Sequence, residues 1–201
     1  MMFTETHCRN AGLSRTDHAA APVSFFITDY VPAMKSKEEG QKMTDRELKE
    51  LFAVLRSGGM TVTTAESCTG GLVAGRITDI AGSSDIFRRG WVTYCDEAKH
   101  EMIGVDKHTL KVYTAVSRET AAEMAEGAAR RAEAQYALSV TGYADGSPEE
   151  PERSGHVFIG CCGPDKTEVR EFHFAGGRSE VRRQAVHEAL KMLADMVKKE
   201  N

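Results

Sequence analysis

The stretch Thr64-Ala65-Glu66-Ser67-Cys68-Thr69-Gly70-Gly71 lies between a short β-rich run, residues 60–63, and a segment with helical spacing, residues 72–77. This order predicts a strand, a tight turn and a helix, with Ser67 where the helix begins. A helix start offers unpaired backbone N–H groups and partial positive charge, which suit a phosphate or a developing oxyanion. Two consecutive glycines let a ligand approach the backbone closely, and a serine hydroxyl there is a nucleophile if a base reaches it.

A structural role fits the same residues, because Ser or Thr before a helix is often an N-cap and Gly-Gly is often only a turn. A second segment favours function. Gly90-Trp91-Val92-Thr93-Tyr94-Cys95-Asp96-Glu97-Ala98-Lys99 again predicts a strand that turns into a helix, and it brings a tyrosine and a lysine to the junction. Taken alone, Lys99 fits a solvated surface lysine and Tyr94 fits a packing residue.

Composition indicates a globular protein. The 201 residues are 41% hydrophobic and 28% charged with a net charge of −4, and no apolar run approaches the ~20 residues of a membrane span. No basic cluster supports nucleic-acid binding. The five cysteines are odd in number and lack metal-finger spacing, so we expect free thiols in a reducing cytoplasm. The seven scattered histidines suggest no metal site.

The chain divides near its first quarter. We expect residues 1–43 to be a poorly ordered extension, or an upstream start on a protein that begins near Met43, and residues 44–199 to be one domain. A capping-box pattern at Thr44 opens the first helix, and Ser117 is expected to cap another. The expected helices are 44–56, 68–79, 96–103, 118–133 and 178–199, and the expected strands are 60–65, 88–95, 138–141, 156–162 and 168–174.

This order predicts an α/β fold, a three-layer α/β/α sandwich on a mixed sheet. Parallel strands need helical crossovers, whereas the turn at 163–166 predicts an antiparallel hairpin near the end of the chain. In such sheets ligands bind beyond the carboxyl ends of the strands. The loop of Ser67, the loop of Tyr94 to Lys99 and the loop that starts at Thr141-Gly142 can all share that edge.

Several short motifs follow one another in the order typical of the CinA C-terminal domain family, which this sequence resembles. They are T-A-E-S-C-T-G-G, then Gly-Ser-Ser at 82–84, G-W-V-T-Y-C-D-E-A-K, Ile103-Gly104-Val105, Ala115-Val116-Ser117, Met124-Ala125-Glu126-Gly127 and Val140-Thr141-Gly142, and they span residues 44 to 199. The best-known members of the family are nicotinamide-nucleotide amidases. The resemblance implies hydrolysis of the carboxamide of nicotinamide mononucleotide (NMN) to nicotinate mononucleotide and ammonia, with a small-molecule nucleotide substrate and no cofactor. We also expect a homo-oligomer.

The resemblance implies catalysis by Ser67, Lys99 and Tyr94. A serine hydroxyl needs a base, and a lysine can be that base if desolvation lowers its pKa. Tyr94 would relay the proton or orient the pair. Substrate binding is assigned to Cys68, Thr69, Gly70, Gly71, Thr141 and Gly142, with backbone N–H groups near Cys68 and Thr69 holding the oxyanion. Cys68 is the alternative nucleophile if its thiol has a low pKa, but Ser67 is the better candidate.

The chain departs from the family pattern in two places. Asp96 stands where members usually carry Asn, which adds a negative charge near Lys99. An acidic loop, residues 143–155, replaces a glycine-rich one, and we expect its acids to face solvent, namely Asp145, Glu149, Glu150 and Glu152. If they line the pocket instead, they repel a nucleotide phosphate. Two alternatives stay open, a non-catalytic nucleotide-binding or partner module and an amidase for a related pyridine carboxamide.

Overall fold

The computed structural model describes residues 43–146 and 151–200. Almost all of the expected N-terminal extension therefore lies outside the described residues, as do Glu149 and Glu150. Met43 is described, and its N–H group donates a hydrogen bond to His187 Nδ1 at 3.1 Å.

Five strands form one mixed sheet in the order β2-β1-β3-β4-β5. The central strand β1 (Val62–Glu66) runs parallel to β2 (Trp91–Val92) and to β3 (Tyr136–Gly142). Strands β4 (His156–Cys162) and β5 (Thr167–His173) continue the sheet with antiparallel pairing. Every residue of β1 is buried, which suits a parallel strand covered on both faces. The mixed sheet and its late hairpin are confirmed.

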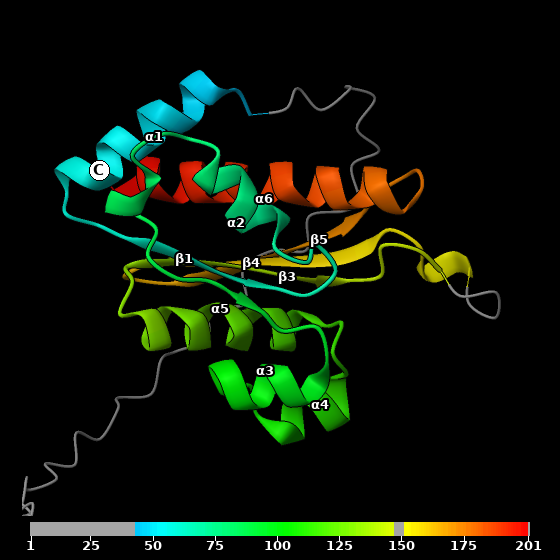
Figure 1. Cartoon of the computed structure of the whole chain (residues 1–201). Coiled ribbons are helices and arrows are strands. Elements are labelled where there is room, and N and C mark those ends of the chain that lie inside the picture. The colour runs from blue at the N-terminus through cyan, green and yellow to red at the C-terminus, as the bar shows by residue number, and fades with distance from the viewer. Residues whose placement is uncertain (1–42, 147–150, 201) are drawn as a thin grey trace, which may run out of the picture. The chain divides into compact units, whose positions relative to one another are not determined.

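Helices cover both faces of this sheet (Figure 1). On one face lie α1 (Asp45–Ser57), α2 (Leu72–Thr78) and the long α6 (Arg178–Glu200), and on the other lie α3 (Asp96–Ile103), α4 (Lys107–Tyr113) and α5 (Arg118–Ala132). Two buried apolar clusters match the two interfaces, so the three-layer sandwich is confirmed. No helix in the described ranges is both long enough and apolar enough to cross a bilayer.

Local signals fix the ends of several elements as expected. Thr44 caps α1 in a complete capping box, where its hydroxyl accepts from Glu47 N–H at 3.2 Å and the Glu47 carboxylate accepts from Thr44 N–H at 2.7 Å. Ser117 caps α5 by accepting from the Thr120 N–H at 3.1 Å. In the hairpin between β4 and β5, Gly163 N–H donates to the Lys166 carbonyl at 2.8 Å.

Two expected elements differ from the structure, and one helix was not expected. The strand expected at 88–95 is only Trp91–Val92. Phe87 makes an isolated bridge to Val62, and residues 88–90, which follow it, do not pair with β1. Helix α4 was not expected, since its sequence Lys-His-Thr-Leu-Lys-Val-Tyr is short and rich in β-branched and polar residues. The helix expected at 68–79 begins at Leu72, for a reason that belongs to the site.

Candidate active site

Ser67 directly follows β1 and lies at the carboxyl edge of the sheet. Its N–H group donates to the Val140 carbonyl of β3 at 2.9 Å, which extends the parallel pairing by one residue. Only 8% of Ser67 is exposed. The serine is thus held by the two central strands rather than by a mobile loop, at the edge where parallel sheets place their ligands.

The start of α2 is occupied by a side chain of the protein itself. The buried carboxylate of Glu66 accepts hydrogen bonds from Gly71 N–H at 2.9 Å, Val73 N–H at 3.0 Å and Ala74 N–H at 2.8 Å. These donors at the start of α2 are therefore not open to a phosphate or an oxyanion, contrary to the expectation for a helix start, whereas the N–H groups near Cys68 and Thr69 are not among them. The helix also starts four residues later than expected, because the turn at 67–71 must bring its first N–H groups onto Glu66.

Lys99 reaches Ser67 from α3 across the carboxyl edge of the sheet. Its Nζ lies 3.4 Å from Ser67 Oγ and donates to the Thr93 carbonyl at 3.0 Å. Lys99 is only 1% exposed, so the surface-lysine interpretation is wrong. Burial disfavours the charged amine and lowers the pKa of Lys99, which is what a lysine base requires.

Asp96 opposes this effect of burial. It lies one helical turn before Lys99, and its negative charge raises the pKa of the lysine, although burial is the larger influence. The Asn-to-Asp departure noted in the sequence therefore makes Lys99 a little harder to deprotonate. This is an electrostatic influence, since Lys99 Nζ bonds to Ser67 and Thr93.

Cys68 is not a competing nucleophile. The pKa of its thiol is raised to about 11, mainly by burial and also by the nearby Glu66 charge, against the opposing influence of its own backbone N–H, Arg178 and Arg182. A neutral thiol is a poor nucleophile near pH 7. Within the described residues, the Thr69 N–H donates to no acceptor and the Cys68 N–H donates only to its own sulfur, so both can turn to an oxyanion.

A cavity of about 240 Å³ opens beside this pair. Six of the nine residues assigned from sequence line it, namely Ser67, Cys68, Tyr94, Lys99, Thr141 and Gly142. The other lining residues are Ala115, Val116, Tyr143, Ala144, Asp145 and Arg178. The three loops expected at one edge therefore do meet around one cavity.

Thr69, Gly70 and Gly71 do not line the cavity. The two glycines have φ values of 58° and 93°, and these positive angles shape the turn that leads onto Glu66. The Thr69 carbonyl accepts from Arg182 at 2.8 Å, which ties the turn to α6. In the structure these residues build the turn behind Ser67.

Thr141 and Gly142 line the cavity but also have structural tasks. The Thr141 hydroxyl donates to the Ala115 carbonyl at 2.6 Å, which fixes the opposite wall. A Cβ on Gly142 would lie 2.6 Å from the His156 carbonyl oxygen and 2.7 Å from Val157, so packing against β4 requires glycine there. The sequence could not distinguish this packing from contact with a ligand.

Tyr94 and Arg178 meet at the mouth of the cavity. Tyr94 is 60% exposed, and its hydroxyl accepts from Arg178 Nη2 at 3.0 Å. Arg178 Nη1 also donates to Asp145 Oδ1 at 2.6 Å. Sequence reasoning did not select Arg178, because an arginine at the first residue of a long helix carries no signal of its own. Apart from Lys99, it is the only cationic side chain among the described residues that line this cavity.

The acidic loop faces the cavity in part. Asp145 is exposed, as expected, but it also lines the cavity and pairs with Arg178, which the sequence did not predict. Glu152 is exposed and does not line the cavity. Among the described residues of the loop, Asp145 places its negative charge against the cation at the cavity mouth.

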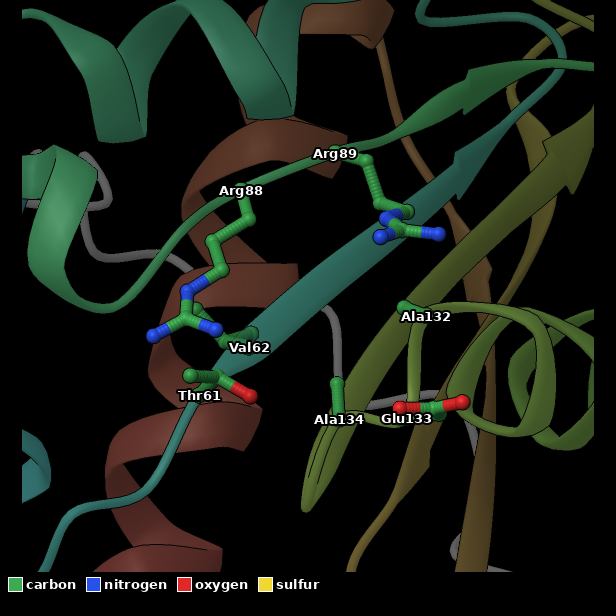
Figure 2. A pocket seen from close by; sticks show the side chains of 7 residues that line it. All are labelled: Thr61, Val62, Arg88, Arg89, Ala132, Glu133 and Ala134. Atoms are coloured by element: carbon green, nitrogen blue, oxygen red, sulfur yellow. The ribbon is translucent and has the colours of Figure 1, made fainter.

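A second, smaller cavity of about 100 Å³ lies at the amino end of β1, where Thr61 and Val62 meet the end of α5. Figure 2 shows Arg88 and Arg89 extending from the chain before β2, with Arg88 reaching toward Thr61 and Val62 and Arg89 on the side of Ala132. None of the residues assigned from sequence lines it. Because Ser67 follows the opposite end of β1, the two cavities belong to opposite edges of the sheet.

Comparison with known proteins identifies the family of the chain. The sequence model of the CinA C-terminal domain matches residues 45–197. The chain belongs to this family. Over 157 residues it is 48% identical to the nicotinamide-nucleotide amidohydrolase PncC of Escherichia coli K12, a match that covers 75% of the chain and 95% of that protein.

Other CinA relatives are longer. The chain is 44% identical over 153 residues to a competence-damage inducible protein of Caldanaerobacter subterraneus, which covers 74% of the chain but only 37% of that protein. A CinA-like protein of Kosmotoga olearia is 43% identical over 150 residues, covering 73% of the chain and 36% of its own length. The chain thus spans little more than a third of these two relatives.

Solved structures of CinA proteins share the fold. A CinA superfamily protein from Escherichia coli matches with a TM-score of 0.71 and 34% identity, over 76% of this chain and 90% of that one. A competence/damage inducible protein from Agrobacterium tumefaciens matches with a TM-score of 0.70 and 41% identity, over 76% and 94%.

Proposed function

We propose that this CinA-family domain is an amidase that hydrolyses the carboxamide of NMN to nicotinate mononucleotide and ammonia. The buried contact between Ser67 Oγ and Lys99 Nζ carries the proposal, because it pairs a nucleophile with a base whose pKa burial lowers. The 48% identity to a nicotinamide-nucleotide amidohydrolase supports the substrate.

In the first half of the reaction, neutral Lys99 takes the hydroxyl proton as Ser67 Oγ attacks the carboxamide carbon. The Thr93 carbonyl holds one amine hydrogen at 3.0 Å and leaves the nitrogen lone pair for Ser67. The carbonyl oxygen becomes an oxyanion, for which the N–H groups of Cys68 and Thr69 are the available donors. Lys99 then returns the proton to the departing nitrogen, and ammonia leaves an ester on Ser67.

In the second half, Lys99 removes a proton from water, which attacks the ester carbon. The tetrahedral species collapses, the proton that Lys99 took passes to Ser67 Oγ, and the product leaves as a carboxylic acid that loses its remaining proton to solvent. The same base and the same oxyanion donors serve both halves, so the scheme needs no further group from the protein.

Arg178 supplies the positive charge that a substrate phosphate needs. Its guanidinium lies at the cavity mouth, held by Tyr94 and Asp145, while the reacting pair lies buried beneath. A planar guanidinium binds phosphate oxygens in pairs. In this scheme Tyr94 orients Arg178, which differs from both roles expected from the sequence, relaying the proton and orienting the Ser67–Lys99 pair.

The test of the proposal is incubation of the purified protein with NMN, followed by separate measurement of ammonia and nicotinate mononucleotide. We expect both products in equal amounts. Nucleotide binding without ammonia would instead identify a non-catalytic module.

Replacing Asp96 with asparagine is expected to move the acidic limb of the kcat/KM profile to lower pH. Asp96 raises the pKa of Lys99, so its neutral replacement leaves more of the lysine deprotonated at any pH on that limb. A pH–rate profile on NMN measures the shift. Glu97→Gln is the matched control, because Glu97 is an exposed neighbouring carboxylate that does not influence the pKa of Lys99. A shift to higher pH in Asp96→Asn would contradict Lys99 as the base.

Asp145→Asn is expected to lower KM for NMN by about two- to fivefold at low salt, with little change in kcat. The substitution removes a charge that competes with phosphate for Arg178, while the amide oxygen can still accept a hydrogen bond. Steady-state kinetics at two salt concentrations test this, with Glu152→Gln as the control in the same loop. A raised KM would show that Asp145 instead orients Arg178 for the substrate.

The Asp145–Arg178 ion pair also favours a second candidate, an amidase for a less anionic pyridine carboxamide. In that case the Asp145–Arg178 ion pair stays intact during turnover, and a phosphate group on the substrate adds nothing to the affinity of the protein for it. Comparing kcat/KM for pyridine carboxamides with and without phosphate separates the two, because only the NMN enzyme prefers the phosphorylated compound.

A further inference from the structure

Two histidines and a glutamate gather on the β4–β5 hairpin, and none of the three lines the Ser67 cavity. His156 and His173 are directly opposite each other in the antiparallel register. Glu171 precedes His173 by two residues, so it lies on the same face of β5. The histidines are far apart in sequence, and only the strand pairing brings them together.

The three side chains converge on one point. Glu171 Oε1 lies 2.8 Å from His156 Nε2 and 3.5 Å from His173 Nε2, and one ligand atom from each residue lies within 4.8 Å of the others. Ligand atoms 2.0–2.2 Å from a tetrahedral Zn²⁺ would be about 3.3–3.6 Å from one another. The observed spacing is thus close to that of a metal site, and shifts of about an ångström or less would complete it.

Neighbouring rings hold the imidazoles in place. The rings of His156 and His173 are stacked with centroids 4.5 Å apart, and the Phe158 ring lies 4.9 Å from the His156 ring. The side chains are 25%, 54% and 36% exposed for His156, His173 and Glu171. The group is therefore ordered by packing on one side and open to solvent on the other.

We propose that His156, His173 and Glu171 form a binding site for a divalent transition-metal ion of the zinc type. Two imidazole nitrogens and one carboxylate oxygen are ligands that Zn²⁺ accepts, and the exposed side leaves room for water as a fourth ligand. The ion would join the edge strand β5 to β4. Since the His156 carbonyl accepts from Tyr143 N–H at 2.9 Å, this metal site lies next to a residue that lines the Ser67 cavity.

The simpler alternative is a histidine–carboxylate hydrogen bond that holds the hairpin without a metal. In that case one imidazole would suffice, and the second histidine would only stack on the first. The proposal differs because it requires all three side chains, and it predicts a binding event that either histidine substitution weakens.

The test is zinc titration of the full, tag-free chain by calorimetry after removal of bound metal. Wild type is expected to bind one more equivalent of Zn²⁺ than the double variant His156→Ala/His173→Ala, and each single variant to lose roughly tenfold or more in affinity at this site. At zinc concentrations a hundredfold above Kd, the Tm of wild type should rise by about 5–10 °C and that of the double variant should not.

Two controls keep the result specific. His108→Ala removes an exposed histidine on α4 and should leave the extra equivalent intact, as should Ser67→Ala in the catalytic pair. Co²⁺ absorption provides a second readout of ligation should calorimetric heats be small. Equal zinc stoichiometry and equal Co²⁺ spectra in wild type and the double variant would overturn the proposal and leave only the hydrogen bond.

Discussion

Replacing Ser67 with alanine is expected to reduce kcat for ammonia release from NMN by about 10⁴-fold or more, because no other group takes over as nucleophile. Cys68 cannot substitute for it, since burial raises the pKa of that thiol to about 11. Substrate binding should change little, as Arg178 and the cavity walls remain. Ammonia release and NMN binding by calorimetry measure the two effects separately.

Cys68→Ala is the matched control for this prediction. It removes the neighbouring side chain from the same turn, and we expect kcat within about tenfold of wild type because only its backbone N–H takes part. The Ser67 N–H bond to Val140 survives in Ser67→Ala, so its fold should be intact by circular dichroism. Full activity in Ser67→Ala, or its loss only in Cys68→Ala, would reject the serine mechanism.

Replacing Lys99 with methionine is expected to reduce kcat by about 10²–10⁴-fold, the usual contribution of a general base. Methionine fills a similar volume in this buried position without an amine, so cavity effects stay small. The acidic limb of the pH–rate profile should disappear in the variant, because that limb reports deprotonation of Lys99. If Lys99 had only a structural role, the pH–rate profile of Lys99→Met would keep the shape of the wild-type profile.

Lys99→Arg separates charge from base strength. The guanidinium keeps the positive charge but does not lose a proton in the working pH range, so we expect it to be as inactive as the methionine variant. Thermal unfolding of both variants tests the fold. Recovery of most activity in Lys99→Arg would mean that the charge, and not proton transfer, is what the reaction uses.

The sequence predicted the meeting of Ser67, Tyr94 and Lys99 for a physical reason. β1 and β2 are parallel neighbours, so the loops that follow them emerge at the same edge of the sheet. The loop after β3 joins them there because β3 pairs with β1 in parallel. The order of helices and strands along the chain, the turn residues and the helix caps can all be recognised locally in the sequence. These signals were enough to predict the three-layer sandwich and the place of the cavity.

Other features depend on contacts between distant segments. Lys99 is typical of a solvated helix position by sequence, and its burial depends on the packing of α3 against α5 and on its contacts with Ser67 and Thr93. Arg178 reaches the cavity from α6, and its bond to Tyr94 joins residues far apart in the chain. Glu66 takes the N–H groups of α2 because the turn folds back onto it, which spacing alone does not reveal.

The most direct test of the central claim is quantitative product analysis of NMN incubated with the purified wild-type protein in the presence of a chelator. Ser67 and Lys99 supply the nucleophile and the base, so the account predicts ammonia and nicotinate mononucleotide in a one-to-one ratio, with undiminished rate when metal is withdrawn. Release of nicotinamide or phosphate in place of ammonia, or no turnover at all, would contradict it.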